Sequence, residues 1–303
     1  IVYQIQTTFS LSGLIISKIK RIPLIYEVNS LLEYEKEKTF FNSIIIKIAK
    51  FTEKQTVKQA SKITVVTPEL KQIFHDEYKI PLHKIDVVPN GADIDLFYPM
   101  DKLKCREELN LAQNKFIVCF VGGLGMGCGA KNIVEAAPYI LEQVPNTHFL
   151  IVGDGPYRAI MEEKIKSLSL RDNFIFIGAV PHEVVPKYIN ASDICIALFT
   201  GERIKEVGGG STIKLYEYMA CSKPVIGTLG LSTFEILTKY KSGIITNSEN
   251  SQDISKSILY LLENEKFRED LGINGRQLVE TKYNWDVITE QVARICEEGM
   301  KNG

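Results

Sequence analysis

The stretch that decides the fold is residues 116–156, FIVCFVGGLGMGCGAKNIVEAAPYILEQVPNTHFLIVGDGP. It contains two apolar runs, Phe116–Val121 and Thr147–Val152, each followed by glycine and each of the length of a buried strand. Between them, Ala130–Gln143 repeats apolar residues at helical spacing. A strand, a helix and a second strand in this order predict a βαβ unit with parallel strands and both sheet faces covered.

The same alternation continues in both directions from this stretch. The further expected strands are Phe174–Ile177, Ile194–Leu198, Pro224–Thr228 and Gly243–Thr246 on one side, and Ile1–Ile5, Pro23–Val28, Lys62–Val66 and Ile85–Val88 on the other. Helical patterns separate them, and the charged segment Ala92–Asn114 is interpreted as a connection between the two series. We therefore predict an α/β protein with two Rossmann-like domains.

The expected domains are residues 1–100, residues 101–282, and a last helix, 283–303, that crosses back to the first domain. The opening residues Ile1–Tyr3 have the pattern of the interior of a strand from the first residue onward. The first domain is therefore expected to be incomplete.

Composition excludes several classes of protein. The 303 residues are 45% hydrophobic and 24% charged with a formal net charge of -1, which excludes a disordered chain and predicts no nucleic-acid partner. No apolar run approaches the ~18–20 residues that span a bilayer. The six cysteines form no CxxC pair and the four histidines show no ligand spacing, so we expect reduced thiols, no metal site and a cytoplasmic location without a signal peptide.

Several expected strands of the second domain end in glycine. Gly122, Gly123, Gly153 and Gly178 each follow an apolar run directly. In doubly wound sheets ligands bind outside the carboxyl ends of the strands, where glycine lets a ligand approach the backbone. Any one of these glycines is also explained by a tight turn. Several of them on one rim favour a ligand of nucleotide size.

A second glycine-led motif, GGGSTIKLYEYMA (208–220), runs directly into a helical pattern. Ser211 or Thr212 is suited to cap this helix, and the free backbone N–H groups at its start are suited to bind a diphosphate. Lys214 in the first turn adds a cation, and the carboxylate of Glu217, on the same face, is suited to bind a vicinal diol such as a ribose. The alternative is an ordinary surface ion pair between Lys214 and Glu217.

These motifs resemble those of a known family. VPNGAD (88–93), GDGP (153–156), KLYEYMA (214–220) and KPVI (223–226) occur in the order found in the GT-B glycosyltransferases of family 4, which retain anomeric configuration and use nucleotide sugars. The resemblance covers about residues 23 to 290. It implies a GT-B fold and transfer of a sugar from a nucleoside diphosphate sugar to an acceptor hydroxyl in glycan or cell-surface polysaccharide synthesis, with no cofactor.

The resemblance also assigns candidate site residues. Lys214 and Asn29 are candidate catalytic residues, and Arg203 and Lys205 are candidate phosphate cations. The expected donor-binding residues are Gly122, Gly123, Gly153, Gly178, Val180, Gly209, Gly210, Ser211, Thr212, Ile213, Lys214 and Glu217.

The chain departs from the family pattern at four positions. Gly123 and Cys128 stand where the family has an arginine and a lysine for the diphosphate. Gly209 replaces the first of two family glutamates, and Asn29 replaces a histidine that contacts the donor sugar. Lys214 is therefore the expected source of diphosphate charge.

The acceptor is expected to be a glycan or a lipid-linked molecule. The predicted helix Phe40–Gln59 carries an apolar stripe of Phe41, Ile44, Ile45, Ile48 and Phe51 beside four lysines. Such a helix is suited to peripheral contact with an anionic bilayer, which places the protein at the inner face of the membrane. The alternative is a solvated helix face over a Rossmann core.

Two other functions remain open from the sequence. One is a non-catalytic nucleotide-binding remnant or partner subunit, and the other is a GT-B nucleotide-sugar epimerase. Family members begin about a hundred residues before the position of Ile1, so we expect this chain alone to be inactive as a transferase. Donor hydrolysis with and without acceptor separates these functions.

Overall fold

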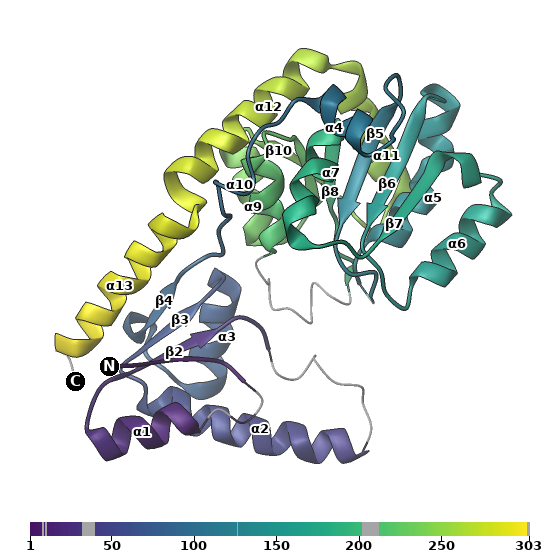
Figure 1. Cartoon of the computed structure of the whole chain (residues 1–303). Coiled ribbons are helices and arrows are strands. Elements are labelled where there is room, and N and C mark those ends of the chain that lie inside the picture. The colour runs from purple at the N-terminus through teal and green to yellow at the C-terminus, as the bar shows by residue number, and fades with distance from the viewer. Residues whose placement is uncertain (8, 10, 32–39, 126, 202–211, 302–303) are drawn as a thin grey trace. The chain divides into compact units, whose positions relative to one another are not determined.

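The computed structural model describes residues 1–7, 9, 11–31, 40–125, 127–201 and 212–301. The chain divides into two compact units, one of Ile1–Asn90 with Asp286–Gly303 and one of Gly91–Arg203 with Thr212–Trp285. Each unit contains a parallel β-sheet with helices packed against it (Figure 1). The structure confirms the predicted α/β class with two Rossmann-like units.

The first unit is built on a four-stranded sheet. Its elements are β1 (Val2–Ile5), α1 (Ser12–Lys20), β2 (Leu24–Val28), α2 (Phe40–Gln59), β3 (Lys62–Val65), α3 (Pro68–Tyr78), η2 (Leu82–Lys84), β4 (Ile85–Val87) and, except for its first residue, α13 (Trp285–Lys301). The strands pair in chain order and all pairs are parallel. Each helix connects one strand to the next along the sheet, always toward the same edge. Because such connections are right-handed, α1, α2 and α3 lie on one face of this sheet.

Helix α13 packs on the opposite face of the first sheet. Gly299 lies against the side chain of Ile25 in β2, so a larger residue at this position would collide with that isoleucine. Ile288 and Ile295 form a small buried cluster with Val88, just after β4. The C-terminal helix thereby completes the core of the unit that begins the chain.

The second unit is built on a six-stranded sheet. Its elements are α4 (Lys102–Glu108), β5 (Phe116–Val121), α5 (Ala130–Gln143), β6 (Thr147–Val152), α6 (Arg158–Ser167), η3 (Arg171–Asn173), β7 (Phe174–Gly178), η4 (His182–Val184), α7 (Val185–Ala191), β8 (Ile194–Ala197), α9 (Ile213–Ala220), β9 (Val225–Thr228), α10 (Ser232–Lys239), β10 (Gly243–Thr246), α11 (Ser251–Glu263), α12 (Glu265–Leu278) and the π-helical turn Val279–Tyr283. The strand order is β10-β9-β8-β5-β6-β7, and every pair is parallel.

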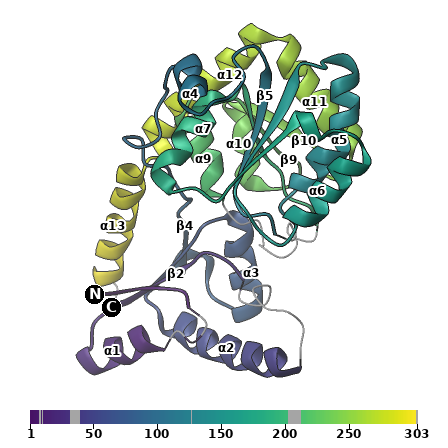
Figure 2. The same cartoon turned by 45° about the vertical axis from the view of Figure 1, so that its right-hand side comes forward.

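Side chains along each strand of this sheet point alternately to its two faces, and helices pack on both faces. Val118 and Phe120 of β5 belong to a large apolar core with residues of α5, α6 and α11. Helices α7 and α9 contact β5, β8 and β9 on the other face (Figure 2). Because β5 pairs with β6 on one side and β8 on the other, the strand order reverses at β5, and ligands of doubly wound sheets bind at such a point.

Two elements differ from the sequence-based expectation. The segment interpreted as a connection contains α4, which is capped by Asp101 through a hydrogen bond from the Lys104 backbone N–H at 2.9 Å. The helix expected to continue to Thr281 changes at Leu278 into a π-helical turn and ends before Asn284, which adopts an extended conformation. Asn284 instead forms an isolated bridge with Ala92.

The cysteines are divided unequally between the units. Cys105, Cys119, Cys128, Cys195 and Cys221 are free and buried in the second unit, as the sequence predicts for reduced thiols. Cys296, on α13 in the first unit, is free and half-buried. Among the described residues, no helix is both long enough and apolar enough to span a membrane.

Candidate active site on the rim of the second sheet

Three of the predicted glycines meet at the carboxyl ends of neighbouring strands. Gly122 follows β5, Gly153 follows β6, and Gly178 ends β7. The Gly122 N–H donates to the Val152 carbonyl at 2.9 Å, and the Gly153 N–H donates to the Gly178 carbonyl at 2.8 Å. At these three positions the rim is therefore hydrogen-bonded backbone that carries no side chain of its own.

Only glycine fits at two of these positions. Gly122 and Gly153 have φ values of 140° and 133°, which L-residues with a side chain rarely adopt. A Cβ on Gly153 would collide with the carbonyl oxygen of Gly122. A Cβ on Gly122 would lie 2.6 Å from Lys214 Nζ. The close approach of strand ends and the position of Lys214 both depend on these glycines.

Arg158 and Lys214 both lie at this rim. Arg158 is beside Gly178 and pairs with Asp154 and Glu162, whereas Lys214 is beside Gly122. Lys214 lies in the first turn of α9, and its Nζ is 4.2 Å from the centroid of the Phe120 ring. The aromatic face attracts the ammonium group and holds it beside the end of β5. A cation at the N-terminus of a helix is disfavoured by the helix dipole, so its position suits an anion bound between them.

Tyr218 ties α9 to β5. Its ring is fully buried, and its hydroxyl accepts a hydrogen bond from the Val121 backbone N–H at 2.8 Å. This contact fixes the register of the helix that carries Lys214 against the strand that ends at Gly122. The sequence analysis did not single out Tyr218, because a tyrosine inside an apolar helix is indistinguishable from ordinary core.

Glu217 is the second candidate of this helix, and its environment differs from the expected one. Its side chain is 10% exposed, and its Oε1 lies 3.0 Å from His182 Nε2. Burial raises the pKa of this carboxyl above its usual value, while His182 and Lys214 act in the opposite direction. Within the described residues, the hydrogen-bond partner of Glu217 is therefore His182, a residue that the sequence analysis did not place in the site.

The N-cap of α9 is one of the two predicted residues, but without the expected side-chain hydrogen bond. Thr212 occupies the N-cap position with an extended backbone, but its side chain makes no capping hydrogen bond. The alternative cap, Ser211, lies outside the described residues, as do Gly209, Gly210, Arg203 and Lys205. The structure therefore describes only the part of this motif that begins at Thr212.

The remaining predicted residues are placed as follows. Gly123 is open around its α-carbon, since an added Cβ would meet no atom within 4 Å. Val180 is half-buried in the loop after β7, and Ile213 is 45% exposed at the start of α9. Asn29 belongs to the first unit, where its side-chain amide donates to Glu27 Oε1 at 2.9 Å.

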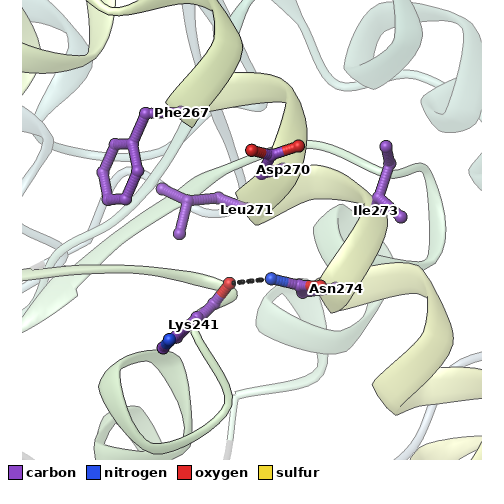
Figure 3. A pocket seen from close by; sticks show the side chains of 6 residues that line it. All are labelled: Lys241, Phe267, Asp270, Leu271, Ile273 and Asn274. Carbon is purple, nitrogen blue, oxygen red and sulfur yellow. Dashed lines mark hydrogen bonds between the residues drawn. The ribbon is translucent and has the colours of Figure 1, made fainter.

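A pocket elsewhere in the second unit lacks the chemistry of this rim. It has a volume of about 350 Å³ and lies between α12 and the turn after α10 (Figure 3). Figure 3 shows the Asn274 amide directed at the carbonyl oxygen of Lys241, to which it donates at 2.9 Å. None of the predicted site residues lines this pocket; its lining residues are Lys241, Phe267, Asp270, Leu271, Ile273 and Asn274. The described residues also contain no group of three or more side chains suited to hold a metal ion.

Known proteins resemble this chain in sequence along most of its length. The model of "Glycosyl transferases group 1" matches residues 101–278, and that of "Glycosyltransferase Family 4" matches residues 1–96. Alpha-D-kanosaminyltransferase of Streptomyces kanamyceticus is 23% identical over 94% of this chain and 72% of its own length. N-acetyl-alpha-D-glucosaminyl L-malate synthase of Bacillus anthracis is 23% identical over 81% of this chain, which spans 62% of that protein.

Solved structures share the fold. HepE of Anabaena, crystallised in complex with UDP, superposes with a TM-score of 0.78 at 20% identity, covering 98% of this chain and 79% of HepE. At this identity the likeness concerns the fold, and it confirms the predicted GT-B fold class with two Rossmann-like domains. Because the first family model covers more than half of the chain, and covers the unit that carries Lys214 and Glu217, the protein belongs to the group 1 glycosyltransferases.

Proposed function

We propose that this protein binds a nucleoside diphosphate sugar at the rim of the second sheet and transfers the sugar to an acceptor hydroxyl with retention of configuration. The observation that carries the proposal is the position of Lys214. Its ammonium group lies beside Gly122, at the point where the strand order reverses and where α9 begins. A cation, a bare backbone and a helix N-terminus at one place are suited to bind a diphosphate.

The second support is the carboxylate one turn further along α9. Glu217 lies three residues after Lys214 and is nearly buried. A carboxylate accepts hydrogen bonds only, and the vicinal hydroxyls of a ribose are donors. A nucleoside diphosphate has its anionic groups and its diol a few ångströms apart, which suits this pair.

The chemistry follows from the charge of the leaving group. When the bond from the sugar to the diphosphate breaks, negative charge builds up on the diphosphate oxygens. Lys214, in the first turn of α9, would stabilise that charge more strongly in the transition state than in the bound donor. Asn29 of the first unit and the cations Arg203 and Lys205 remain proposals from the family pattern. Retention and a role in polysaccharide synthesis likewise rest on the resemblance.

The test is an assay that separates three functions. The chain is incubated with UDP-glucose, UDP-N-acetylglucosamine or GDP-mannose, with and without a panel of glycan and lipid-linked acceptors. A transferase is expected to release nucleoside diphosphate together with a glycosylated acceptor. An epimerase converts the nucleotide sugar to its epimer without acceptor, and a binding-only protein shows affinity for UDP or GDP but no turnover. Absence of UDP and GDP binding would contradict the proposal as a whole.

We also propose that the first unit contacts anionic membrane at its α1 and α2 side, where a lipid-linked acceptor would be met. Ile44, Ile48 and Phe51 are 46%, 49% and 62% exposed and share one face of α2. Both views in Figures 1 and 2 show α1 beside α2, and Ile15 and Ile19 of α1 are 52% and 72% exposed. Ile45 of the predicted stripe is half-buried, and the side chain of Phe41 is outside the described set.

The charge of residues 1–90, which include α1 and α2, supports an anionic surface as the partner. Residues 1–90 contain 13 Lys and Arg against 9 Asp and Glu. Lys47, Lys54 and Lys58 are exposed on α2 near the apolar stripe. Each basic residue near an anionic bilayer contributes about 1 kcal/mol of attraction, in addition to the burial of the apolar side chains.

The expected result is co-sedimentation with liposomes that contain phosphatidylglycerol, weakened by salt and lost with phosphatidylcholine alone. Phe51→Asp is expected to reduce binding severalfold, because it places a charge on the inserted face. Ile160→Asp is the matched control, since Ile160 is 55% exposed on α6 of the second unit. Sedimentation that is indifferent to anionic lipid, or equally affected by both substitutions, would reject this surface.

A further inference from the structure

His182 is placed where it can control the carboxylate of Glu217. It begins η4, directly after the loop that follows β7, and its Nε2 lies 3.0 Å from Glu217 Oε1. A carboxylate can only accept, so Nε2 of the histidine is the donor in this contact. The imidazole is 59% exposed, whereas the carboxylate is 10% exposed. The histidine therefore stands at the mouth of the site and the carboxylate within it.

The imidazole is also held from its other side. The Phe97 ring lies against it, with 5.1 Å between ring centroids and 56° between ring planes. Phe97 is fully buried, and its carbonyl oxygen accepts a hydrogen bond from Arg276 Nη1 at 2.8 Å. The same Arg276 nitrogen donates to the carbonyl of Ala220 at the end of α9 at 2.9 Å. The position of His182 is thus tied to the helix that carries Glu217.

This arrangement leaves one carboxylate oxygen available. Within the described residues, Glu217 Oε2 accepts no hydrogen bond, while Oε1 accepts one from His182. Oε2 is not one of the buried polar atoms that lack a partner, so it is open to a donor from solvent or from a ligand. The contact from His182 fixes the side-chain torsions of Glu217 before any ligand arrives.

We propose that His182 is a positioning residue for recognition of the ribose diol: it orients Glu217 so that Oε2 is presented to a hydroxyl group of the nucleotide. This inference rests on the proposed function, because it assumes that a nucleoside diphosphate occupies the rim. His182 itself does not touch the reacting atoms. Its contribution is to avoid the loss of side-chain freedom that Glu217 would otherwise suffer on binding.

The experiment compares nucleotides with and without the diol. Binding of UDP and of 2′,3′-dideoxy-UDP is measured by calorimetry, and the pair GDP and 2′,3′-dideoxy-GDP serves if the protein prefers guanine. The wild-type chain is expected to bind the ribonucleotide more tightly. His182→Ala is expected to weaken ribonucleotide binding about tenfold and to leave dideoxynucleotide binding unchanged.

Three further variants separate positioning from a purely structural role. His182→Gln retains a donor near the position of Nε2 and is expected to restore most of the affinity. In the Glu217→Ala background, His182→Ala is expected to cause no further loss, since the two residues act as one unit. His83→Ala, at an exposed histidine of the first unit, is the matched control and is expected to have no effect.

The possible failures are distinguishable. If His182→Ala weakens binding of the ribonucleotide and the dideoxynucleotide equally, His182 has a structural role only and the inference is wrong. If the wild-type chain binds both nucleotides of a pair equally, Glu217 does not recognise a diol and the inference is also wrong. If neither UDP nor GDP binds, the proposed function fails and the inference fails with it.

Discussion

Replacement of Asp193 by alanine is expected to destabilise the second unit by about 3–5 kcal/mol, the typical cost of leaving one partner of a buried ion pair alone. Asp193 precedes β8, and its side chain is 3% exposed. It accepts hydrogen bonds from Arg106 Nη2 and Lys102 Nζ, both at 2.7 Å, and from the Ile117 N–H at 2.8 Å. Arg106, whose side chain is 2% exposed, would be left with an uncompensated charge.

The pH dependence of this contribution has a definite sign. Burial alone would raise the pKa of Asp193, but the hydrogen bonds from Lys102 and the Ile117 N–H, with the charge of Arg106, outweigh it and lower the pKa. The contribution is therefore fully present above the unfolded pKa of aspartate, about 3.9, and is lost as pH falls through the lower folded value. The Asp193→Ala variant is expected to lose less stability in acid than the wild-type chain.

Hydrogen exchange of β5 and β8 in the full chain measures this effect, because it reports on the second unit alone. Glu108→Ala is the matched control, since it removes the exposed Lys187–Glu108 pair, at 2.6 Å, from the neighbouring α4 and α7. Exposed pairs contribute about 0–1 kcal/mol, so the control is expected to change protection little. Equal protection in the two variants would show that the buried pair does not stabilise this unit.

Replacement of Lys214 by alanine is expected to weaken binding of UDP or GDP by about 10- to 100-fold. This range corresponds to about 1.5–3 kcal/mol, the scale of a hydrogen bond to a charged group. The loss is expected to be smaller at high salt, because screening weakens the ammonium–diphosphate attraction in both proteins. Affinity for uridine or guanosine, which lack phosphates, is expected to stay unchanged.

Calorimetry with the nucleotide and the matching nucleoside measures both expectations. Lys239→Ala is the matched control: Lys239 is an exposed lysine of the same unit that also packs on an aromatic ring, at 5.4 Å from the centroid of Tyr240. Lys239→Ala also removes one positive charge and one lysine–aromatic contact, but at the end of α10 and away from the strand ends that carry Gly122 and Gly153. Equal losses for the nucleotide and the nucleoside in Lys214→Ala would place Lys214 outside the diphosphate site.

The fold could be predicted from the sequence wherever local signals agree with the tertiary environment. The run Thr147–Val152 is a strand with the predicted bounds because Phe149–Val152 are apolar and the run ends at glycine. Thr67 and Pro68 mark the start of α3, where the Thr67 hydroxyl accepts from the Leu70 N–H at 3.2 Å. Helix α4 was missed because it is short and charged, and because one of its buried residues, Arg106, is the kind that usually lies in solvent.

The site could be predicted only where the chain itself brings residues together. Lys214 and Glu217 share a helix, so their spacing was sufficient to group them. His182 and Tyr218 reach the site through contacts between distant segments, 35 residues apart for His182–Glu217 and 97 for Val121–Tyr218. No local pattern marks such pairs, since they arise from the packing of α9 against the ends of β5 and β7.

The unequal placement of the cysteines gives the two units different exposure to oxidants and alkylating agents. Cys119 and Cys221 are buried in the second unit, and burial raises the pKa of both thiols, so little reactive thiolate forms there. Burial raises the pKa of the Cys296 thiol on α13 as well, but this residue is only half-buried and can be reached from solvent. Alkylation of the native chain is therefore expected first at Cys296 in the C-terminal helix. Labelling of a buried thiol in the second unit would require that unit to unfold at least locally.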